Sequence, residues 1–364
     1  MNYDLIIIGA GPAGAAAAIS SARQGASVLL LDRGRFPRHK VCGEFVSAEA
    51  LGLLAEFLDL EHAALIQDAV RIPRARVFLD GRTLQARVDP PAASIARFEL
   101  DVALWQSALS AGVDARQQVT VQSIAGRGPF RIATNHGEFE SRALVNASGR
   151  WSNLNLPPAE NGVRREKWLG VKAHFAEPSL EPSVDLYFFE GGYCGVQPVV
   201  VAGESGGRVN ASAMVRADLA STLPEVFARH PGLRERSRKW SPLSDPVSTS
   251  PLIFRQPQPE RDGMLMVGDA AGFVDPFVGD GISLALRGGA LAAHCLASFF
   301  SGEASLFAAA RSYGKAYEQS LLPVFRASST IRRMLFLPGS IRKPLLFILE
   351  RTPAMTEYLV RRTR

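Results

Sequence analysis

Residues 5–18 read LIIIGAGPAGAAAA, an apolar run that meets three closely spaced glycines and continues into an alanine-rich stretch. This pattern predicts a β-strand, a tight turn and a helix, the beginning of a Rossmann-type fold. Gly9 allows the turn, Gly11 lets a diphosphate approach the backbone, and Gly14 lets the helix pack closely on the strand. The helix would direct backbone N–H groups and a partial positive charge at the diphosphate. The stretch therefore predicts a dinucleotide-binding site.

A second apolar run, ASVLLL at residues 26–31, ends in Asp32, eighteen positions after Gly14 (32 minus 14). An acid at this distance is expected to accept hydrogen bonds from an adenosine ribose, which favours FAD or NAD over NADP. Arg33 and Arg35 follow closely, so the 2′-phosphate of NADP remains an alternative ligand at this position. We therefore count Arg33 with the residues expected to contact the cofactor.

The composition is typical of a soluble globular protein of about two domains. The chain has 364 residues, 47% hydrophobic and 21% charged. Three widely spaced cysteines predict neither a disulfide framework nor a zinc site, and six scattered histidines give no reason to expect a metal. We expect no signal peptide and no membrane-spanning run, and a reducing cytoplasmic location.

Most of the net charge of +6 lies near the C-terminus. Residues 326–364 hold nine Arg or Lys against Glu350 and Glu357, a local net charge of +7, interleaved with the apolar segments LFL and PLLFIL. This pattern suits either an amphipathic helix on an anionic membrane surface or a basic helical subdomain packed on the body. It lacks the regular aromatic residues of a nucleic-acid groove, and the chain has no Gly-x-Ser-x-Gly elbow, so neither a nucleic-acid partner nor a hydrolase is expected.

Residues 33–45, RGRFPRHKVCGEF, form a basic segment between the second strand and the next helix. Pro37 and Gly43 predict an irregular loop, and Ser47 is a suitable N-cap for the helix that follows. The loop carries Cys42, which we take as the candidate catalytic residue because loops near a cofactor often carry chemistry. A small buried cysteine without a chemical role is the alternative.

A second glycine-rich stretch, GDAAGFVDPFVGDGI at residues 268–282, follows another apolar strand. A strand ending at Gly268 and Asp269, a tight glycine and proline loop, and a helix starting near Gly281 again direct backbone donors toward a ligand. This stretch is the second anchor of the predicted site.

Together these motifs resemble a known superfamily, that of FAD-dependent aromatic hydroxylases and geranylgeranyl reductases. The resemblance rests on the GAGPAG turn with Asp32, the ASG tripeptide at residues 147–149, and the stretch at residues 268–282. KVCGE, residues 40–44, and GDAAGFVDP are more similar to the geranylgeranyl reductase branch. The resemblance covers most of the chain and implies bound FAD, with NAD(P)H or another external electron donor.

The resemblance also implies roles for individual residues. It places Cys42 beside the reactive face of the flavin. It assigns Gly9, Gly11, Ala13, Gly14 and Arg97 to the FAD diphosphate, Asp32 to the ribose, Gly268 and Asp269 to the ribityl chain or diphosphate, and Gly279, Gly281 and Ile282 to the pyrimidine edge of the isoalloxazine. A helix N-terminus at that edge would stabilise the negative charge of reduced flavin, which carries the redox chemistry.

The expected fold class is α/β. Residues 1–75, 95–150 and 263–300 would form a Rossmann-type FAD/NAD(P)-binding domain, residues 76–94 and 151–262 an inserted, mostly β substrate lobe, and residues 301–364 a basic C-terminal helical region.

Three functions remain open at this point. The first is a reductase that saturates carbon–carbon double bonds of a hydrophobic isoprenoid or lipid-like substrate. The second is a monooxygenase or halogenase-like enzyme for a polyketide or aromatic substrate, and the third is a non-catalytic FAD-binding scaffold. The GFVDP form of residues 272–276 favours the reductase, because hydroxylases usually carry histidine after GDAA. The aromatic substrate motif of the reductases is missing, and YCGVQP at residues 193–198 is its nearest counterpart.

Overall fold

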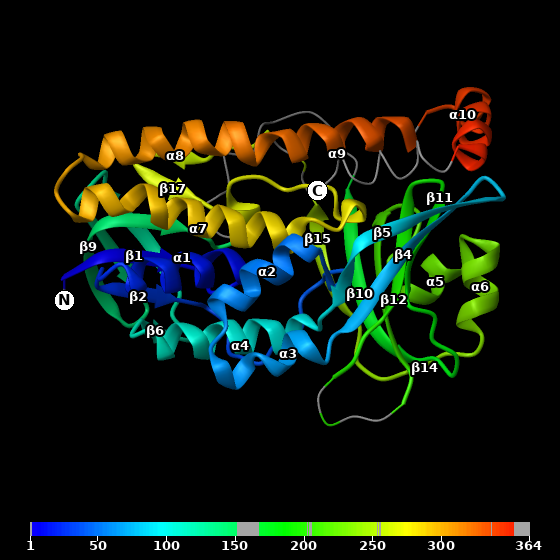
Figure 1. Cartoon of the computed structure of the whole chain (residues 1–364), viewed down its shortest axis with the longest axis horizontal. Helices are drawn as coiled ribbons and strands as arrows, with labels where there is room; N and C mark the ends of the chain where they lie inside the picture. The colour runs from blue at the N-terminus through cyan, green and yellow to red at the C-terminus, as the bar shows by residue number, and fades with distance from the viewer. Residues whose placement is uncertain are drawn as a thin grey trace.

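The computed structural model describes residues 2–352 except 151–166, 202, 204–205, 253, 255 and 336. Two β-sheets lie toward opposite ends of an elongated molecule, and helices pack along and between them (Figure 1). The predicted α/β class, with a Rossmann-type unit, is confirmed. The predicted start of the larger lobe segment, residues 151–166, lies outside the described residues.

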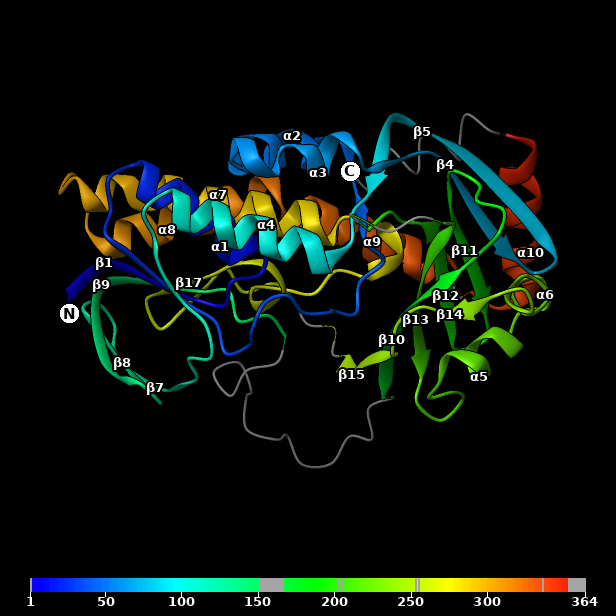
Figure 2. The ribbon, with the colours of Figure 1, turned by 90° about the horizontal axis from the view of Figure 1, so that it is seen from below.

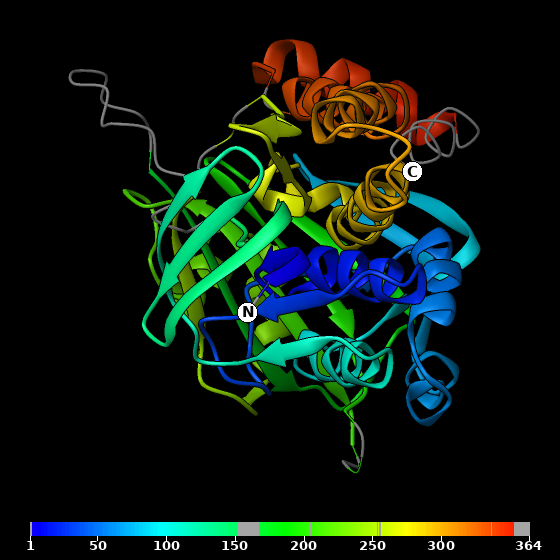
Figure 3. The same ribbon diagram turned by 90° about the vertical axis from the view of Figure 1, so that its left-hand side faces the viewer.

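The first sheet is the Rossmann-type unit, in which β1 pairs in parallel with β2 and β9. Its order is β16-β17-β9-β1-β2-β6, with β7 and β8 added as antiparallel strands beside β9. The ribbon of β7 to β9 covers one face and helices cover the other (Figure 3). The strands are β1 (Asn2–Ile8), β2 (Val28–Leu31), β6 (Asp114–Arg116), β7 (Val121–Gly126), β8 (Phe130–Thr134), β9 (Gly137–Asn146), β16 (Glu260–Arg261) and β17 (Met264–Met266).

Two glycines let the backbone of α1 approach its neighbours closely, because they leave no side chain at the contact. A Cβ on Gly14 in α1 (Pro12–Arg23) would lie 1.8 Å from the Gly9 carbonyl oxygen. A Cβ on Gly289 in α7 (Gly281–Phe300) would lie 2.1 Å from the Ala13 carbonyl oxygen. α4 (Arg97–Ser110) also packs on α1. The start of α1 is thereby fixed between β1 and α7.

α7 departs from the expectation that no run is long enough to span a membrane. By length and composition alone it could cross one, yet 56% of its apolar window is buried inside the protein. It packs on α1 and α8. Core packing accounts for its apolar composition.

The second sheet forms the β lobe, in the order β14-β10-β13-β12-β11-β4-β5-β3, with β15 beside β10. β4 and β5 form a hairpin, with Asp80 and Gly81 at φ +52° and +75° in its turn. The lobe begins earlier than residue 76, because β3 and the start of β4 belong to this sheet. The strands are β3 (Phe45–Val46), β4 (Val70–Leu79), β5 (Arg82–Ser94), β10 (Trp168–Ala176), β11 (Ser183–Phe189), β12 (Gly192–Pro198), β13 (Arg208–Arg216), β14 (Ser241–Pro242) and β15 (Val247–Leu252).

Shorter helices connect these elements. The predicted cap at Ser47 is confirmed, since its side chain accepts a hydrogen bond from the Ala50 N–H at 3.3 Å. The connecting helices are α2 (Ala48–Phe57), η1 (Leu60–His62), α3 (Ala64–Gln67), α5 (Leu223–Ala228), α6 (Pro231–Ser237), η2 (Gly268–Ala270) and η3 (Pro276–Val278).

The C-terminal region is helical as far as it is described, and residues 353–364 lie outside the described part. α8 (Leu306–Ser320) and α9 (Leu322–Leu335) run one after the other from the Rossmann-type unit to the β lobe (Figure 1). α10 (Gly339–Arg351) then packs against β5 at the far end of the molecule (Figures 1 and 2). This region therefore joins the two lobes.

Candidate active site

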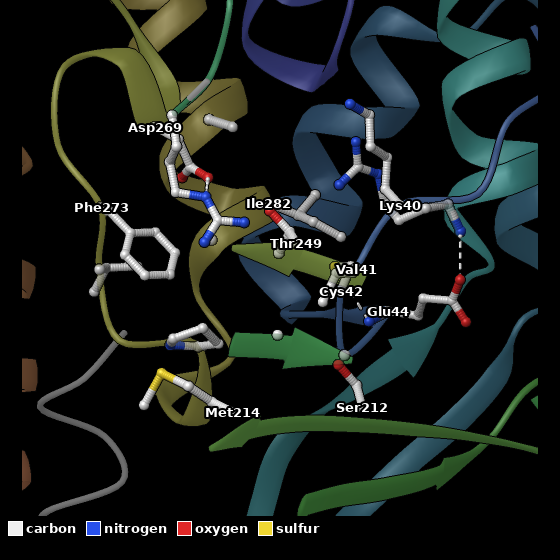
Figure 4. Close-up of a pocket in the computed structure, with 18 of the residues that line it drawn as sticks. Lys40, Val41, Cys42, Glu44, Ser212, Met214, Thr249, Asp269, Phe273 and Ile282 are labelled. Atoms are coloured by element: carbon white, nitrogen blue, oxygen red, sulfur yellow. Dashed lines mark hydrogen bonds and ion pairs between the residues drawn. The ribbon is translucent and has the colours of Figure 1, made fainter. Parts of the chain in front are cut away.

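A cavity of about 920 Å³ lies where the two lobes meet. Its volume is in the range of sites for large organic ligands. One end is lined by the glycine turn after β1, the loop of residues 38–45 and the second anchor, and Figure 4 shows part of this lining. The other end is lined by apolar side chains of the β lobe, of the second anchor and of the C-terminal helices, namely Val77, Leu84, Leu186, Phe188, Phe277, Met334, Leu335 and Leu346.

Gly11 opens the glycine turn onto the cavity. A Cβ at Gly11 would meet only the Arg97 side chain, at 4.0 Å, whereas a Cβ at Gly9 would lie 2.3 Å from the Ala147 carbonyl oxygen. Gly9 also has φ +103°, which favours glycine. Gly9 therefore shapes the turn, and Gly14 lets α1 pack closely on that turn. Gly11 keeps a space in front of the helix start.

Two helices begin at this cavity. α1 starts after Gly11 and α7 starts at Gly281, and neither has a side-chain hydrogen bond at its N-cap. Ala13 and Ile282, from the first turns of these helices, line the cavity. Helix starts of this kind attract anions, because their N–H groups and dipoles point outward.

Asp32 lies at the glycine end, but its carboxylate is already occupied. Its Oδ1 accepts hydrogen bonds from the Gly34 N–H and Arg38 at 2.7 and 2.6 Å, and its Oδ2 from the Ala10 N–H and Arg38 at 2.8 and 2.8 Å. Burial raises the pKa of Asp32, but Arg38 and the two N–H groups outweigh it and lower the pKa overall. A ribose hydroxyl could reach these oxygens only if Arg38 moved away. Arg33 is exposed at the rim of the cavity.

Two further cations line the same end. Burial, helped by the nearby Arg38 and Arg97, lowers the pKa of Lys40 to about 8. The Arg97 guanidinium donates to both oxygens of Asp101 at 2.7 and 2.9 Å. Arg97 therefore lies at the predicted diphosphate site, but its charge is already paired with Asp101. Lys40 adds a second positive charge there.

Glu44 is fully buried and forms the centre of an ion cluster. Its carboxylate accepts hydrogen bonds from Lys172, from His174 Nε2 at 2.8 Å and from the Arg97 backbone N–H at 2.9 Å. Burial alone would raise the pKa of Glu44, but Lys172 and His174 lower it to about 2. Because Lys172 and His174 belong to β10, the cluster ties the loop of residues 38–45 to the β lobe.

Cys42 lies on this loop and lines the cavity. The Glu44 N–H donates to its sulfur at 3.3 Å, and Asn210 of β13 donates to its carbonyl oxygen at 3.0 Å. Burial would lower the pKa of Arg97, but Asp101 and the Cys42 sulfur raise it overall. Cys42 is a free thiol. The structure therefore holds Cys42 beside a guanidinium at the wall of the cavity.

Two of the three acids in the second anchor, Asp269 and Asp275, have different partners. Asp269 faces Arg150 at 3.4 Å, and the Arg150 guanidinium lies 4.2 Å from the centre of the Phe273 ring (Figure 4). Gly268 and Gly279, which flank this anchor, both have positive φ, at +58° and +81°. Gly268, Asp269, Gly279 and Gly281 all line the cavity.

Asp275 is buried beside the apolar end. Its Oδ1 accepts a hydrogen bond from the Tyr193 hydroxyl at 3.2 Å, and Arg332 of α9 lies 3.5 Å from its Oδ2. Burial raises the pKa of Asp275 to about 6 and raises that of Tyr193 well above its ordinary value.

Four further residues, Lys40, Glu44, Tyr193 and Asp275, belong to the site but were not predicted as site residues. All four lie in motifs quoted above, KVCGE, GFVDP and YCGVQP, so those motifs were the signal that could have identified them. Among the residues that the structure describes, no group of three or more His, Cys, Asp or Glu side chains could hold a metal ion.

A family model described as FAD dependent oxidoreductase matches residues 39–294, and a second one with the same description matches residues 4–56. The chain belongs to the FAD-dependent oxidoreductase family. Membership supports FAD as the cofactor, and the open turn at Gly11 and the two helix starts fit a dinucleotide diphosphate and a flavin edge.

The sequence of this oxidoreductase is similar to those of several curated proteins. Menaquinone reductase of Mycobacterium tuberculosis (strain CDC 1551 / Oshkosh) is 29% identical over 82% of this chain and 77% of its own length. Digeranylgeranylglycerophospholipid reductase 2 of Methanopyrus kandleri is 28% identical over 90% of this chain and 85% of its own length. Conditioned medium factor receptor 1 of Dictyostelium discoideum is 26% identical over 82% of this chain, which spans only 64% of that relative.

The solved structure of the flavin-dependent brominase Bmp2 superposes on this oxidoreductase with a TM-score of 0.80 at 21% identity. The superposition covers 100% of this chain and 93% of the brominase chain. The described part of the chain, including α8 to α10, therefore has the fold of this flavin-dependent enzyme.

Proposed function

We propose that this FAD-dependent oxidoreductase reduces carbon–carbon double bonds in a hydrophobic isoprenoid or lipid-like substrate. The observation that carries the proposal is the form of the cavity, which joins a glycine-rich, anion-attracting end to an apolar end in one continuous space. A long apolar substrate could lie in the second end with one double bond at the first. The named reductases support this choice, because their names specify menaquinone and a digeranylgeranyl glycerophospholipid.

The glycine end would hold FAD through backbone and cationic groups. Gly11 and the start of α1 would face the diphosphate, with Lys40 supplying a positive charge, and the start of α7 would face the flavin edge. The remaining predicted contacts keep their assigned roles, except that Asp32 would act on the ribose only after Arg38 moves. The residues that line the cavity and would contact FAD are Gly9, Gly11, Ala13, Asp32, Arg33, Arg97, Gly268, Asp269, Gly279, Gly281 and Ile282. Gly14 does not line the cavity and would act only by letting α1 pack closely on the glycine turn.

The reaction requires two electrons and two protons in total. Bound FAD, reduced by NAD(P)H or another external donor, would supply a hydride to one carbon of the double bond. A proton must reach the other carbon. Of the ionisable side chains that line the cavity, which also include His39 and Lys40, we take Cys42 and Tyr193 as the candidate donors, and the Tyr193 hydroxyl is hydrogen-bonded to the buried Asp275. The apolar side chains would exclude water and align the double bond.

A monooxygenase or halogenase-like activity on an aromatic or polyketide substrate is the second candidate. Aromatic rings at the apolar end favour it, since Phe188, Tyr193 and Phe277 have ring centroids 5.3 to 6.1 Å apart. Such a group could surround a planar substrate.

The deciding experiment mixes photoreduced protein with a geranylgeranyl lipid in the absence of oxygen. We expect reduced flavin to be oxidised only when substrate is present, with a saturated product. Oxygen alone should give slow, featureless reoxidation. A long-lived intermediate that forms only with oxygen and decays as oxygen or halogen enters an aromatic substrate would overturn the reductase proposal. Failure of every reductant and substrate would support the scaffold alternative.

A matched variant locates the substrate. Leu84→Trp narrows the apolar end, so it should raise the KM for the lipid and leave reoxidation by oxygen unchanged. Phe307→Trp, on the exposed start of α8, should change neither quantity.

A further inference from the structure

We infer that the outer face of α10 docks this protein onto an anionic lipid bilayer. The inference rests on the proposed function only for its purpose, which is access to a lipid-like substrate. It narrows the expectation for the basic tail from residues 326–364 to one helix with a defined outward side.

The first observation is a cluster of exposed apolar side chains on α10. Ile341, Ile348 and Phe347 are 57%, 52% and 38% exposed. Ile341 and Ile348 are seven positions apart (348 minus 341), so they lie on the same side of the helix, two turns apart. Among the described residues, no other element exposes more than one large apolar side chain. Clustered exposure of this kind marks an interaction surface.

The second observation is the sign of the surrounding charge. Lys343 and Arg351 are exposed and stand four positions before and after Phe347, and the Arg351 guanidinium lies 4.1 Å from the centre of that ring. The acid on this helix, Glu350, pairs with Arg82 of the β lobe. Cations beside exposed apolar groups complement an anionic bilayer surface.

The remaining cations of the region are divided between the surface and the interior. Arg326 and Arg333 on α9 are exposed. Arg332 and Arg342 instead turn inward, Arg332 toward Asp275 and Arg342 toward both oxygens of Asp80 at 2.7 and 2.8 Å. Of the described cations, those that turn inward fix the helices to the body, and those on the outer side supply the charge that the proposed docking surface would use.

The third observation is that the inner side of α10 closes the cavity. Leu346 is 3% exposed and lines the apolar end together with Leu335 of α9. The Arg342–Asp80 pair fixes the helix to the tip of the β4–β5 hairpin. α10 lies at one extremity of the molecule in two perpendicular views (Figures 1 and 2). A bilayer on its outer face would therefore lie one helix away from the substrate end of the cavity.

The test is co-sedimentation of the full protein with vesicles. The vesicles contain phosphatidylcholine alone, or phosphatidylcholine with an equal amount of phosphatidylglycerol. We expect binding to the anionic vesicles that weakens as salt rises. The double variant Ile341→Glu/Ile348→Glu should lower the binding constant by roughly tenfold or more, because it removes apolar contact and adds negative charge.

The control is Phe307→Glu. Phe307 is 68% exposed at the start of α8, at the opposite end of the molecule, and receives one change of the same kind, an exposed apolar side chain replaced by Glu. It should bind anionic vesicles like the unchanged protein. Equal loss in both proteins, or equal binding to neutral and anionic vesicles, would overturn the inference. A concentration-dependent dimer that only the double variant disrupts would assign the face to a second copy and would overturn it as well.

Failure of the docking proposal can be distinguished from failure of the proposed reductase function. Ile341 and Ile348 do not line the cavity, so the double variant should keep its flavin spectrum. Its reduced flavin should also still be oxidised by substrate dispersed in detergent. Vesicle binding without any substrate reduction would reject the reductase and leave the docking surface standing.

Discussion

The two ends of the cavity are built in different ways. At the glycine end the wall that would meet the diphosphate is backbone, shaped by Gly9 and Gly11 within one short stretch of chain. At the apolar end the surface is side chains from β4, β5, β11, α9 and α10, which are far apart in sequence. A local sequence motif can therefore define the first end, whereas the second depends on how the lobes pack.

The same contrast holds for the two buried carboxyl groups. Glu44, beside the glycine end, has Lys172, His174 and a backbone N–H as partners, and its pKa is lowered to about 2. Asp275, beside the apolar end, has Tyr193 and a more distant Arg332, and its pKa is raised to about 6. Burial acts in the same direction on both groups, so the number and distance of the partners decide the outcome.

The largest expected effect is complete loss of flavin from Gly11→Val. Gly11 has φ −73°, which valine can adopt, and a Cβ there meets no backbone, so the variant should fold. The new side chain would fill the space in front of α1. Absorbance at flavin wavelengths after purification measures the result, and Gly52→Val, on an exposed helix position with open space, should stay yellow. A flavin-replete Gly11→Val protein would refute the assigned cradle.

The second prediction concerns the Glu44 cluster. Lys172→Met should lower the free energy of unfolding by about 3–5 kcal/mol at neutral pH, because it leaves a buried carboxylate without its cation. Adding Glu44→Gln should recover part of that loss. Urea unfolding gives both values. Arg238→Met removes the exposed Arg238–Glu235 pair and should cost less than about 1 kcal/mol. Equal costs for the two single variants would show that the cluster contributes no more than a surface pair.

The third prediction uses the opposite shift of Asp275. Because its pKa is higher in the folded protein than in the unfolded chain, its contribution to stability is complete below about pH 4 and is lost as pH rises through about 6. Asp275→Asn has no such loss. The variant should therefore gain stability relative to the unchanged protein between about pH 4 and pH 7, by on the order of 3 kcal/mol at most. Urea unfolding across this range measures the difference, and a difference independent of pH would contradict the shift.

Particular residues show why the sequence predicted one end better than the other. The strand, turn and helix around Gly11 follow from neighbouring letters, and so does the Asp80–Gly81 hairpin. Arg38 lies in a basic loop, and nothing local reveals that its guanidinium occupies the carboxylate of Asp32. Lys172 and His174 are more than a hundred positions from Glu44 and meet it only through lobe packing. The inward turn of Arg332 and Arg342 likewise depends on partners in distant strands and loops.

The smallest expected effect comes from Cys42, which lies at the junction of the two ends. Cys42→Ser replaces a large, polarisable acceptor beside Arg97 with a small hydroxyl, so the charge distribution next to the proposed flavin position changes. We expect turnover to fall several-fold, about 1 kcal/mol in the barrier, together with a shift of the flavin reduction potential. Anaerobic reductive titration and steady-state kinetics measure the two quantities. Cys295→Ser, in α7 away from the cavity lining, is the control and should leave both unchanged. If Cys42→Ser also leaves both unchanged, Cys42 is a packing residue of the loop, and the chemistry must draw its proton from the Tyr193–Asp275 pair or from solvent.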